Sequence, residues 1–274
     1  MVDDLENNIK FNLSYLEDYY RTPIIAIIYN PYSEGVSEED IENFLSFINE
    51  VFTKENIKKC ILILHGRGGF LTPALICSQL LRTNLNYYSV IVPYAAASAL
   101  GYLALQSNKL IISKKTILTQ MDPLLDELDE RGEPLRAIKC RNHKNQAIRE
   151  ESRIIMANIE DRLSEFFCKK KNCILPKFAF NENGLRYSFL QKFIGIIMNG
   201  DNHHSQININ ELKNLGLNIV DGQSEIMEMC QGIVRNCEQK IENLKGRLLI
   251  CTKDNIYDEF ERISNMGNGE ISVL

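Results

Sequence analysis

The chain has 274 residues, of which 45% are hydrophobic, so it is long enough to bury the core of one large α/β domain. Its formal net charge of −5 excludes a general nucleic-acid binder, which needs a net basic face. No apolar run reaches the roughly 18 residues that span a bilayer, and the acidic start does not have the pattern of a secretory signal. We therefore expect a soluble, cytoplasmic protein with no membrane span and no nucleic-acid partner.

Eight cysteines are spread along the chain, and no two of them form a Cys-x-x-Cys pair. A chain of this length does not need disulfide bonds for stability, and no second pair of ligands completes a zinc site. We expect reduced thiols, no bound metal and no cofactor. The cysteines are Cys60, Cys77, Cys140, Cys168, Cys173, Cys230, Cys237 and Cys251.

In chain order, the first half of the sequence alternates between amphipathic helices and apolar strands. Strands that alternate with helices at this spacing indicate βαβ crossovers and a mainly parallel sheet. The continuous apolar run at 24–29 suits a strand covered on both faces. The predicted elements are helix 1–22, strand 24–29, helix 37–52, strand 60–64, helix 71–82, strand 88–92, the helix that contains Ser98, and short strands 109–113 and 116–119.

The second half is predicted to be more helical. Residues 126–136 are polar and turn-rich, and we expect a loop there. The elements that follow are a long helix 137–167, helices 187–200 and 209–216, strand 217–220, helix 225–243, strand 248–251, helix 254–264 and a glycine-rich end. Cys230 and Cys237 are seven residues apart on one helix face, which is typical of core positions. We expect three parts: an N-terminal helix (1–22), a main domain (23–222) and a helical C-terminal extension (223–274).

Two stretches carry the residues of a candidate active site. Ser98 lies where strand 88–92 passes into an apolar helix, so its hydroxyl is near a helix N-terminus. Strand 60–64 ends in a loop with glycines at 66, 68 and 69, whose N–H groups can approach a ligand closely. A hydroxyl and a set of N–H donors are the nucleophile and the oxyanion hole of an acyl-transfer site. The alternative interpretation is a serine N-cap on a strand-to-helix turn.

The order of these features resembles one known family. His65 and Gly68-Gly69 resemble its Leu-His-Thr-Pro-Gly-Gly motif, segment 93–105 resembles the part that holds its nucleophile, and Asp122-Pro123 resembles its Val-Asp-Pro turn. Residues 22–220 thus resemble the serine dehydrogenase proteinase family, a branch of the ClpP/crotonase-like superfamily related to signal peptide peptidase A. The resemblance implies a serine protease with a ClpP/crotonase-like fold, built from ββα-type repeats around a mainly parallel sheet.

The chain departs from the family's pattern around the site. Arg67 stands where the family has Pro, and Ala99-Leu100 replaces a Gly-Gly pair directly after the serine. Ser205-Gln206 replaces the usual acid and its neighbour, and the Trp of that loop is missing. The Ala99-Leu100 change could narrow the approach to the N–H beside Ser98.

A serine hydroxyl needs a base within hydrogen-bond reach. Peptidases related to signal peptide peptidase A use a Ser–Lys dyad, and the family's lysine, which follows a Pro-x-x-[Ala/Ser]-Ile stretch, resembles Lys139. A lysine serves as a base only if burial or a cationic neighbour lowers its pKa from about 10.4 towards 7–8. Arg136 and Arg141 lie near it in sequence, and Lys144 is a further candidate. For both lysines the alternative is an exposed helix charge.

Three other residues could take part. His204 resembles the family's histidine, and an imidazole titrates near neutral pH, although a loop histidine can also simply bind backbone. His65 lies in the glycine loop and is expected to shape it. Asp122 either orients a base or closes the Asp-Pro turn.

We therefore interpret the chain as a serine hydrolase that acts on a peptide or protein substrate. Ser98 is the nucleophile, the N–H groups of Gly68, Gly69 and Ala99 hold the oxyanion, and Lys139 is the base. Two alternatives remain open. One is a catalytically weak scaffold that binds an extended peptide along a strand edge. The other is a crotonase-type enzyme acting on an acyl-CoA, although no glutamate lies beside the glycine loop.

A homo-oligomer is also expected. The superfamily that the chain resembles forms rings or stacked trimers. Helices 137–167 and 187–198 offer more hydrophobic surface than one sheet face needs.

Overall fold

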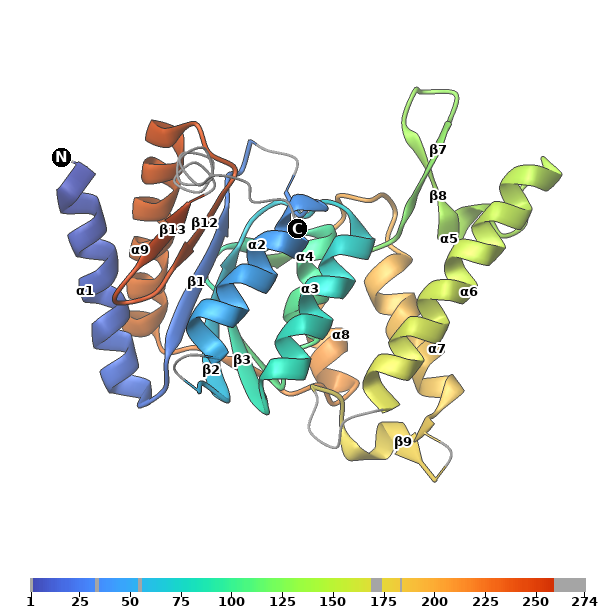
Figure 1. The fold of residues 1–274 in the computed structure, drawn as a ribbon. Coiled ribbons are helices and arrows are strands. Elements are labelled where there is room, and N and C mark those ends of the chain that lie inside the picture. The colour runs from blue at the N-terminus through green and yellow to red at the C-terminus, as the bar shows by residue number, and fades with distance from the viewer. Residues whose placement is uncertain (1, 33–34, 54–55, 169–173, 183, 259–274) are drawn as a thin grey trace, which may run out of the picture.

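A seven-stranded sheet forms the centre of the computed structural model, which describes residues 2–32, 35–53, 56–168, 174–182 and 184–258 (Figure 1). Five strands run parallel, and two further strands extend the sheet at one side through two antiparallel pairings. The predicted α/β fold with a mainly parallel sheet is therefore confirmed. In spatial order the strands are β11 (Ile219–Asp221), β5 (Lys109–Ile112), β3 (Tyr87–Val92), β2 (Lys59–His65), β1 (Ile24–Tyr29), β12 (Leu248–Cys251) and β13 (Ile256–Asp258).

Alternate residues of the central strands face two different helical layers (Figure 1). Residues 24, 26 and 28 of β1 pack in one buried cluster with helices α1 (Val2–Tyr20) and α9 (Ser224–Leu244). Residues 25, 27 and 29 pack in a second cluster with the helices of the opposite layer. All six residues of β1 are buried, which explains its continuous apolar run. The opposite layer contains α2 (Glu39–Phe47), α3 (Leu71–Asn84) and α4 (Ser98–Leu105).

Between β6 (Ile117–Leu118) and β11 the chain forms an arm at one end of the sheet (Figure 1). Buried residues of this arm, such as Met156, Ile159 and Phe193, belong to the same core cluster as the sheet. The arm and its connection contain the hairpin β7 (Leu124–Leu128) and β8 (Pro134–Arg136), α5 (Ala137–Cys140), α6 (Gln146–Cys168), a 3-10 helix (Lys177–Ala179), β9 (Phe180–Asn181), β10 (Gly184–Leu185), α7 (Tyr187–Met198) and α8 (Ile209–Asn214). A separate two-stranded pair joins β4 (Ala95–Ala96) and β6 (Ile117–Leu118).

The prediction of a loop over 126–136 is wrong over residues 126–128 and 134–136, which belong to the strands of the hairpin β7–β8, while residues 129–133 form its turn. Asp129 closes its turn: the Asp129 N–H donates to Glu133 O at 2.7 Å, and the carboxylate accepts from the N–H groups of Arg131 and Glu133. The hairpin projects from the molecule, and most of its side chains are exposed (Figure 1). Its polar composition reflects this exposure rather than a lack of regular structure.

The predicted helix 137–167 is wrong as a single helix, because a turn separates α5 from α6. Asn145 starts the second helix, since its Oδ1 accepts a hydrogen bond from the Ala147 N–H at 2.9 Å. Helix periodicity continues on both sides of this break, so the hydrophobic pattern alone did not reveal it. The predicted helix 37–52 likewise divides into α2 and a π-helical segment, Ile48–Thr53.

The predicted helix 254–264 is wrong over residues 256–258, which form strand β13. β13 pairs with β12 and satisfies the backbone groups of an otherwise open edge. A turn closes this hairpin, with the Thr252 N–H donating to Asn255 O at 2.8 Å. Residues 259–264 and the glycine-rich end lie outside the described residues.

The long helices are amphipathic. Cys230 and Cys237 of α9 are completely buried, which confirms their predicted place in the core. Among the described residues no helix, including the 23-residue α6, is long and apolar enough to cross a membrane.

Candidate active site

The glycine loop after β2 lies directly against the turn that carries Ser98. The Gly66 N–H donates to Ala95 O, and Gly66 O accepts from the Ala97 N–H, each at 3.1 Å. Gly68 has a φ of +134°, and a Cβ at this position would lie 2.8 Å from Ser98 Cβ. Only glycine fits between the loop and the turn at this distance.

Ser98 is the first residue of α4 and has a strained backbone. Its φ is +46°, in the left-handed region that non-glycine residues rarely adopt. The N-cap is Ala97, which makes no side-chain cap bond, so the alternative interpretation of Ser98 as a serine N-cap is wrong. The Ser98 N–H donates to Thr119 Oγ1 at 3.0 Å, which helps to hold the turn. Backbone strain of this kind costs about 1–3 kcal/mol and is concentrated at functional sites.

The backbone of Val36 fixes the other side of the glycine loop. The Val36 N–H donates to Gly68 O at 2.6 Å, and the Phe70 N–H donates to Val36 O at 2.7 Å. In a trans peptide the C=O and the following N–H point in opposite directions, so the Gly69 N–H points away from Val36. Within the described part of the chain, the N–H groups of Gly68, Gly69 and Ala99 have no hydrogen-bond acceptor.

Ser98 lines a cavity of about 600 Å³ together with residues from the glycine loop and the arm. Among the described residues, Ser98 Oγ has no hydrogen-bond partner, so it is available to a ligand or to a base that moves towards it. The cavity is lined by Gly69, Phe70, Leu71, Ser98, Ala99, Met121, Asp122, Pro123, Leu124, Leu125, Asp126, Pro134 and His203.

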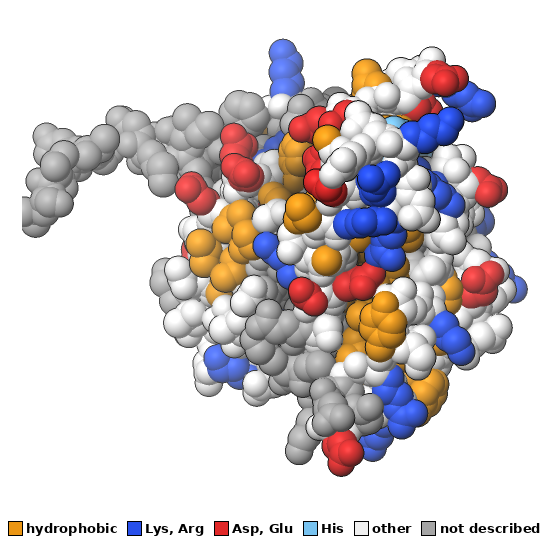
Figure 2. Space-filling view, turned by 90° about the vertical axis from the view of Figure 1, so that its right-hand side faces the viewer, with side chains coloured by type: hydrophobic (Ala, Val, Ile, Leu, Met, Phe, Trp, Pro, Cys, Tyr) orange, Lys and Arg blue, Asp and Glu red, His pale blue; other side chains and the backbone are white. Residues whose placement is uncertain are grey.

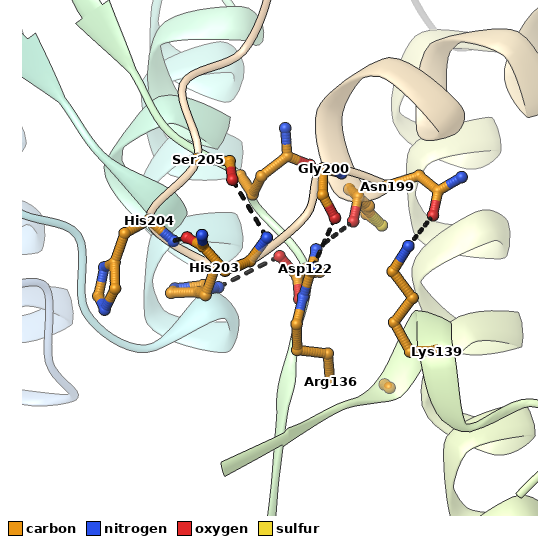
Figure 3. Close-up of polar contacts among 12 residues, drawn as sticks. Asp122, Arg136, Lys139, Asn199, Gly200, His203, His204 and Ser205 are labelled. Carbon is orange, nitrogen blue, oxygen red and sulfur yellow. Dashed lines mark hydrogen bonds and ion pairs between the residues drawn. The ribbon is translucent and has the colours of Figure 1, made fainter. Parts of the chain in front are cut away.

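Two residues that line this cavity are His203, a candidate general base, and Asp122, its acidic partner. His203 Nδ1 lies 3.2 Å from Asp122 Oδ1, and the Asp122 side chain is fully buried (Figure 3). Arg136 Nε donates to the other carboxylate oxygen, while its terminal nitrogens donate to Gly200 O and Met198 O at 2.7 Å. Burial alone would raise the pKa of Asp122, but the hydrogen bonds and charges of His203 and Arg136 outweigh burial and hold it below its usual value.

Segment 119–122 connects the nucleophile to the loop that contains His203. The Thr119 hydroxyl oxygen accepts a hydrogen bond from the Ser98 N–H. The N–H of the next residue, Gln120, donates to Ser205 O at 3.0 Å. Two residues further on is Asp122, which contacts His203. One short stretch of backbone therefore sets the relative positions of the serine, the histidine and the carboxylate.

The other predicted site residues lie elsewhere. Lys139 Nζ donates to Asn199 Oδ1 at 2.6 Å, on the side of Arg136 away from His203, and it does not line the cavity (Figure 3). Lys144 is exposed. The His204 ring points away from Asp122, with its centroid 5.7 Å from that of His203. Neither Lys139 nor His204 lies among the cavity residues, and their role as bases stays a prediction.

His65 binds protein groups at the start of the glycine loop. Its Nε2 lies 3.0 Å from Glu238 Oε1, and its Nδ1 accepts the Ala95 N–H at 3.3 Å. These contacts fit the prediction that it shapes the loop. Among the described residues, no three His, Cys, Asp or Glu side chains gather as a metal-binding group.

His203 is the cavity residue that the sequence reasoning missed. The two adjacent histidines were visible, but only the register of the loop on segment 119–122 decides which of them reaches Asp122. That register depends on tertiary backbone contacts that leave no pattern in the sequence.

Comparisons with known proteins find distant structural similarity alone. No known family matches the sequence, and no curated protein matches it. Among solved structures, a mutant of the membrane-bound stomatin-specific protease 1510-N is similar, with 14% identity over 71% of this chain and 79% of that chain and a TM-score of 0.43. ClpP1 from Listeria monocytogenes is 12% identical over 77% of this chain and 99% of that chain, with a TM-score of 0.43. A mutant of that ClpP1 has the same coverage, 14% identity and a TM-score of 0.44.

Replacing Asp122 by Asn should destabilise the protein in a pH-dependent way. At pH 7 we expect the free energy of unfolding to fall by about 1–3 kcal/mol, because the Arg136 side chain, which is only 11% exposed, loses its charged partner. The folded pKa of Asp122 lies below the unfolded one, so its stabilising contribution is complete above about pH 4 and disappears as the pH falls through the folded pKa. Urea unfolding at pH 7 and pH 3 should therefore show a smaller difference between wild type and variant at pH 3.

The matched control for this measurement is Asp201→Asn, which changes an exposed carboxylate in the same loop as His203. It should shift the free energy of unfolding by no more than about 0.5 kcal/mol at either pH. If Asp122→Asn lowered the free energy of unfolding by the same amount at both pH values, this would contradict a lowered pKa of Asp122 in the folded protein.

Proposed function

We propose that this chain is a serine hydrolase that cleaves peptide bonds, with Ser98 as its nucleophile. The observation that carries the proposal is the left-handed backbone of Ser98, which is pressed against Gly68 and lines a cavity. A purely structural position with this φ would favour glycine, because a side chain adds strain there. The motifs that resemble the serine dehydrogenase proteinase family support the same activity.

His203 is the general base in this proposal, in place of Lys139. It lines the cavity with Ser98, and Asp122 binds its Nδ1, so that Nε2 is the nitrogen able to accept a proton. Productive chemistry requires Nε2 to come within about 3 Å of Ser98 Oγ, and such contacts commonly tighten only when substrate binds. Asp122 also stabilises the imidazolium that forms, as the buried acid of a catalytic triad does.

The reaction then follows the two-step course of acyl transfer. His203 accepts the Ser98 proton as Oγ attacks the carbonyl carbon of the peptide, and the negative charge that develops on the carbonyl oxygen is held by the free N–H groups of the glycine loop and Ala99. His203 returns the proton to the leaving amine as the C–N bond breaks. Water, deprotonated by His203, then hydrolyses the acyl-serine ester and regenerates Ser98.

A polypeptide is the substrate class that the shape of the site supports. A second cavity of about 780 Å³ adjoins the first, and Phe70, Leu71 and Pro123 line both. Phe70 is 60% exposed, so a large apolar surface lies between the two cavities. Two adjoining cavities that share an apolar wall suit an extended chain with side chains on both sides of the cleaved bond.

Variants of Ser98 separate its chemistry from its backbone strain. Ser98→Ala and Ser98→Gly should both lose labelling by a fluorophosphonate probe and lower peptide hydrolysis by several powers of ten. The alanine keeps the strained backbone, so urea unfolding should give a free energy within about 0.5 kcal/mol of wild type. The glycine should be more stable than the alanine by up to about 1 kcal/mol.

Each alternative function predicts a different result in these assays. Equal labelling of wild type and Ser98→Ala would remove Ser98 from the mechanism. A wild type that binds peptides but is not labelled would support the scaffold, and hydration or hydrolysis of an acyl-CoA by Ser98→Ala would support the crotonase-type reaction.

Substitution of His203, Lys139 and His204 decides which of these three candidate bases acts on Ser98. His203→Ala should lower the rate of peptide hydrolysis by a factor of about 10²–10⁴, the usual contribution of a general base. Lys139→Ala and His204→Ala should each stay within about threefold of wild type, because neither side chain lines the cavity. An inactive Lys139→Ala protein beside an active His203→Ala protein would restore the Ser–Lys dyad.

The homo-oligomer also remains a proposal, and the arm is the surface that supports it. Figure 2 shows the face of the molecule at the arm's end, where hydrophobic side chains lie exposed among Lys and Arg. Leu128 of the hairpin and Ile154 of α6 are each 61% exposed. Large apolar side chains exposed on a projecting element favour association with another copy.

Light scattering at micromolar concentration should return a multiple of the single-chain mass of 31.5 kDa. Ile154→Glu should reduce that mass without unfolding the chain, since the side chain is exposed. Phe11→Glu, which changes a 70% exposed residue on α1, is the control and should leave the mass unaltered. A wild-type mass of one chain would contradict the proposal.

A further inference from the structure

We propose that Arg247 and Asp40 are positioning residues that hold the oxyanion loop in its working geometry, a role that rests on the proposed hydrolase function. Neither residue lines the cavity that contains Ser98, although Arg247 lines the adjoining cavity of about 780 Å³. They act through a short chain of contacts that leads from the start of β12 to the peptide between Gly68 and Gly69.

Asp40 lies at the start of α2, and its side chain is completely buried. Arg247 binds it with both terminal nitrogens, each 2.9 Å from a different carboxylate oxygen. The carboxylate also accepts from the Ser37 N–H at 2.7 Å and from the Tyr29 hydroxyl at 3.2 Å. A bidentate pair with further hydrogen bonds has little freedom to move, so Arg247 is held in one orientation.

One of these two nitrogens, Arg247 Nη1, also donates to Gly35 O at 2.7 Å. The next residue, Val36, donates its N–H to Gly68 O, and Gly35 itself lies so close to this carbonyl that a Cβ would be 2.3 Å from Gly68 O. The loop at 35–36 therefore occupies a fixed place between the guanidinium and the glycine loop.

The hydrogen bond between the Val36 N–H and Gly68 O determines where the Gly69 N–H points. The peptide plane between Gly68 and Gly69 can rotate at low cost, because glycine adopts many φ and ψ values. The hydrogen bond from Val36 to Gly68 O removes that freedom and turns the Gly69 N–H away from Val36. A loss of Arg247 releases the loop at 35–36 and with it the orientation of this donor.

The expected signature is a loss of transition-state stabilisation with little loss of substrate binding. An oxyanion donor acts on the charge that develops during the reaction, so its misalignment lowers kcat while KM changes little. Arg247→Met should lower kcat by about 10- to 100-fold and leave KM within about threefold. A rise in KM larger than the fall in kcat would instead mean that Arg247 binds substrate in the adjoining cavity, and would overturn the positioning role. The affinity for a peptide aldehyde, which forms a tetrahedral oxyanion with Ser98, should fall by the same factor as kcat/KM.

Hydrogen–deuterium exchange of the full chain gives a readout that does not depend on activity. In Arg247→Met the amides of Val36 and Phe70 should exchange at least about tenfold faster, because their bonds to the glycine loop open more often. Arg247→Lys keeps the charge but cannot bind both carboxylate oxygens and Gly35 in the same geometry, so it should give intermediate values of both exchange and kcat.

Lys240→Met is the matched control, because it removes a cation that is 5% exposed and paired with Glu6 on the opposite face of the sheet. It should destabilise the protein without a selective effect on the loop amides or on kcat. The positioning role is overturned if the loop amides of Arg247→Met exchange no faster than those of Lys240→Met. It is also overturned if those amides exchange faster while kcat and aldehyde affinity keep their wild-type values.

The proposed function fails separately, through a wild-type protein that is not labelled at Ser98 and hydrolyses no peptide. In that case the catalytic part of the inference falls with it. The exchange measurement still decides whether Arg247 and Asp40 hold the loop.

Discussion

The contact on which the site depends is the approach of the glycine loop to Ser98. Backbone hydrogen bonds produce it from two sides, through Gly66 to the segment before α4 and through Gly68 to Val36. Because these bonds join backbone to backbone, strand register rather than side-chain identity sets the distance. The left-handed φ of Ser98 and the positive φ of the glycines have the same cause. The two chain segments pack closer together than residues with ordinary side chains and backbone angles allow.

The hydrophobic pattern predicted the centre of the molecule well, for a clear physical reason. Strands covered on both faces must be apolar throughout, and the limits of β1 agree with its apolar run. The glycine loop and Ser98 were also recognisable, since the loop directly follows such a strand and Ser98 lies six residues after the end of another. These features are local, so they leave a local pattern in the sequence.

The arm was harder to predict, because tertiary contacts decide its structure. The hairpin at 124–136 is exposed and polar, so its strands carry no alternation to mark them. At the break before α6, short-range side-chain hydrogen bonds of His143, Asn145 and Arg149 hold the turn. The choice between two neighbouring histidines depends on how the loop is placed against segment 119–122. In each case residues distant in the chain, or a few short-range side-chain hydrogen bonds, supply the deciding contact.

The reversal of strand direction beside β1 has a consequence for the site. In a parallel sheet, functional loops gather at the carboxyl ends of the strands. A further parallel strand would start at the opposite edge, but β12 runs antiparallel and pairs its first residue, Leu248, with Tyr29 at the end of β1. The residue before it, Arg247, therefore reaches the segment that follows β1, where its carbonyl accepts the Asn30 N–H at 2.8 Å and its side chain reaches Gly35. Because β12 is antiparallel, a segment from the end of the sequence supports a loop formed near its beginning.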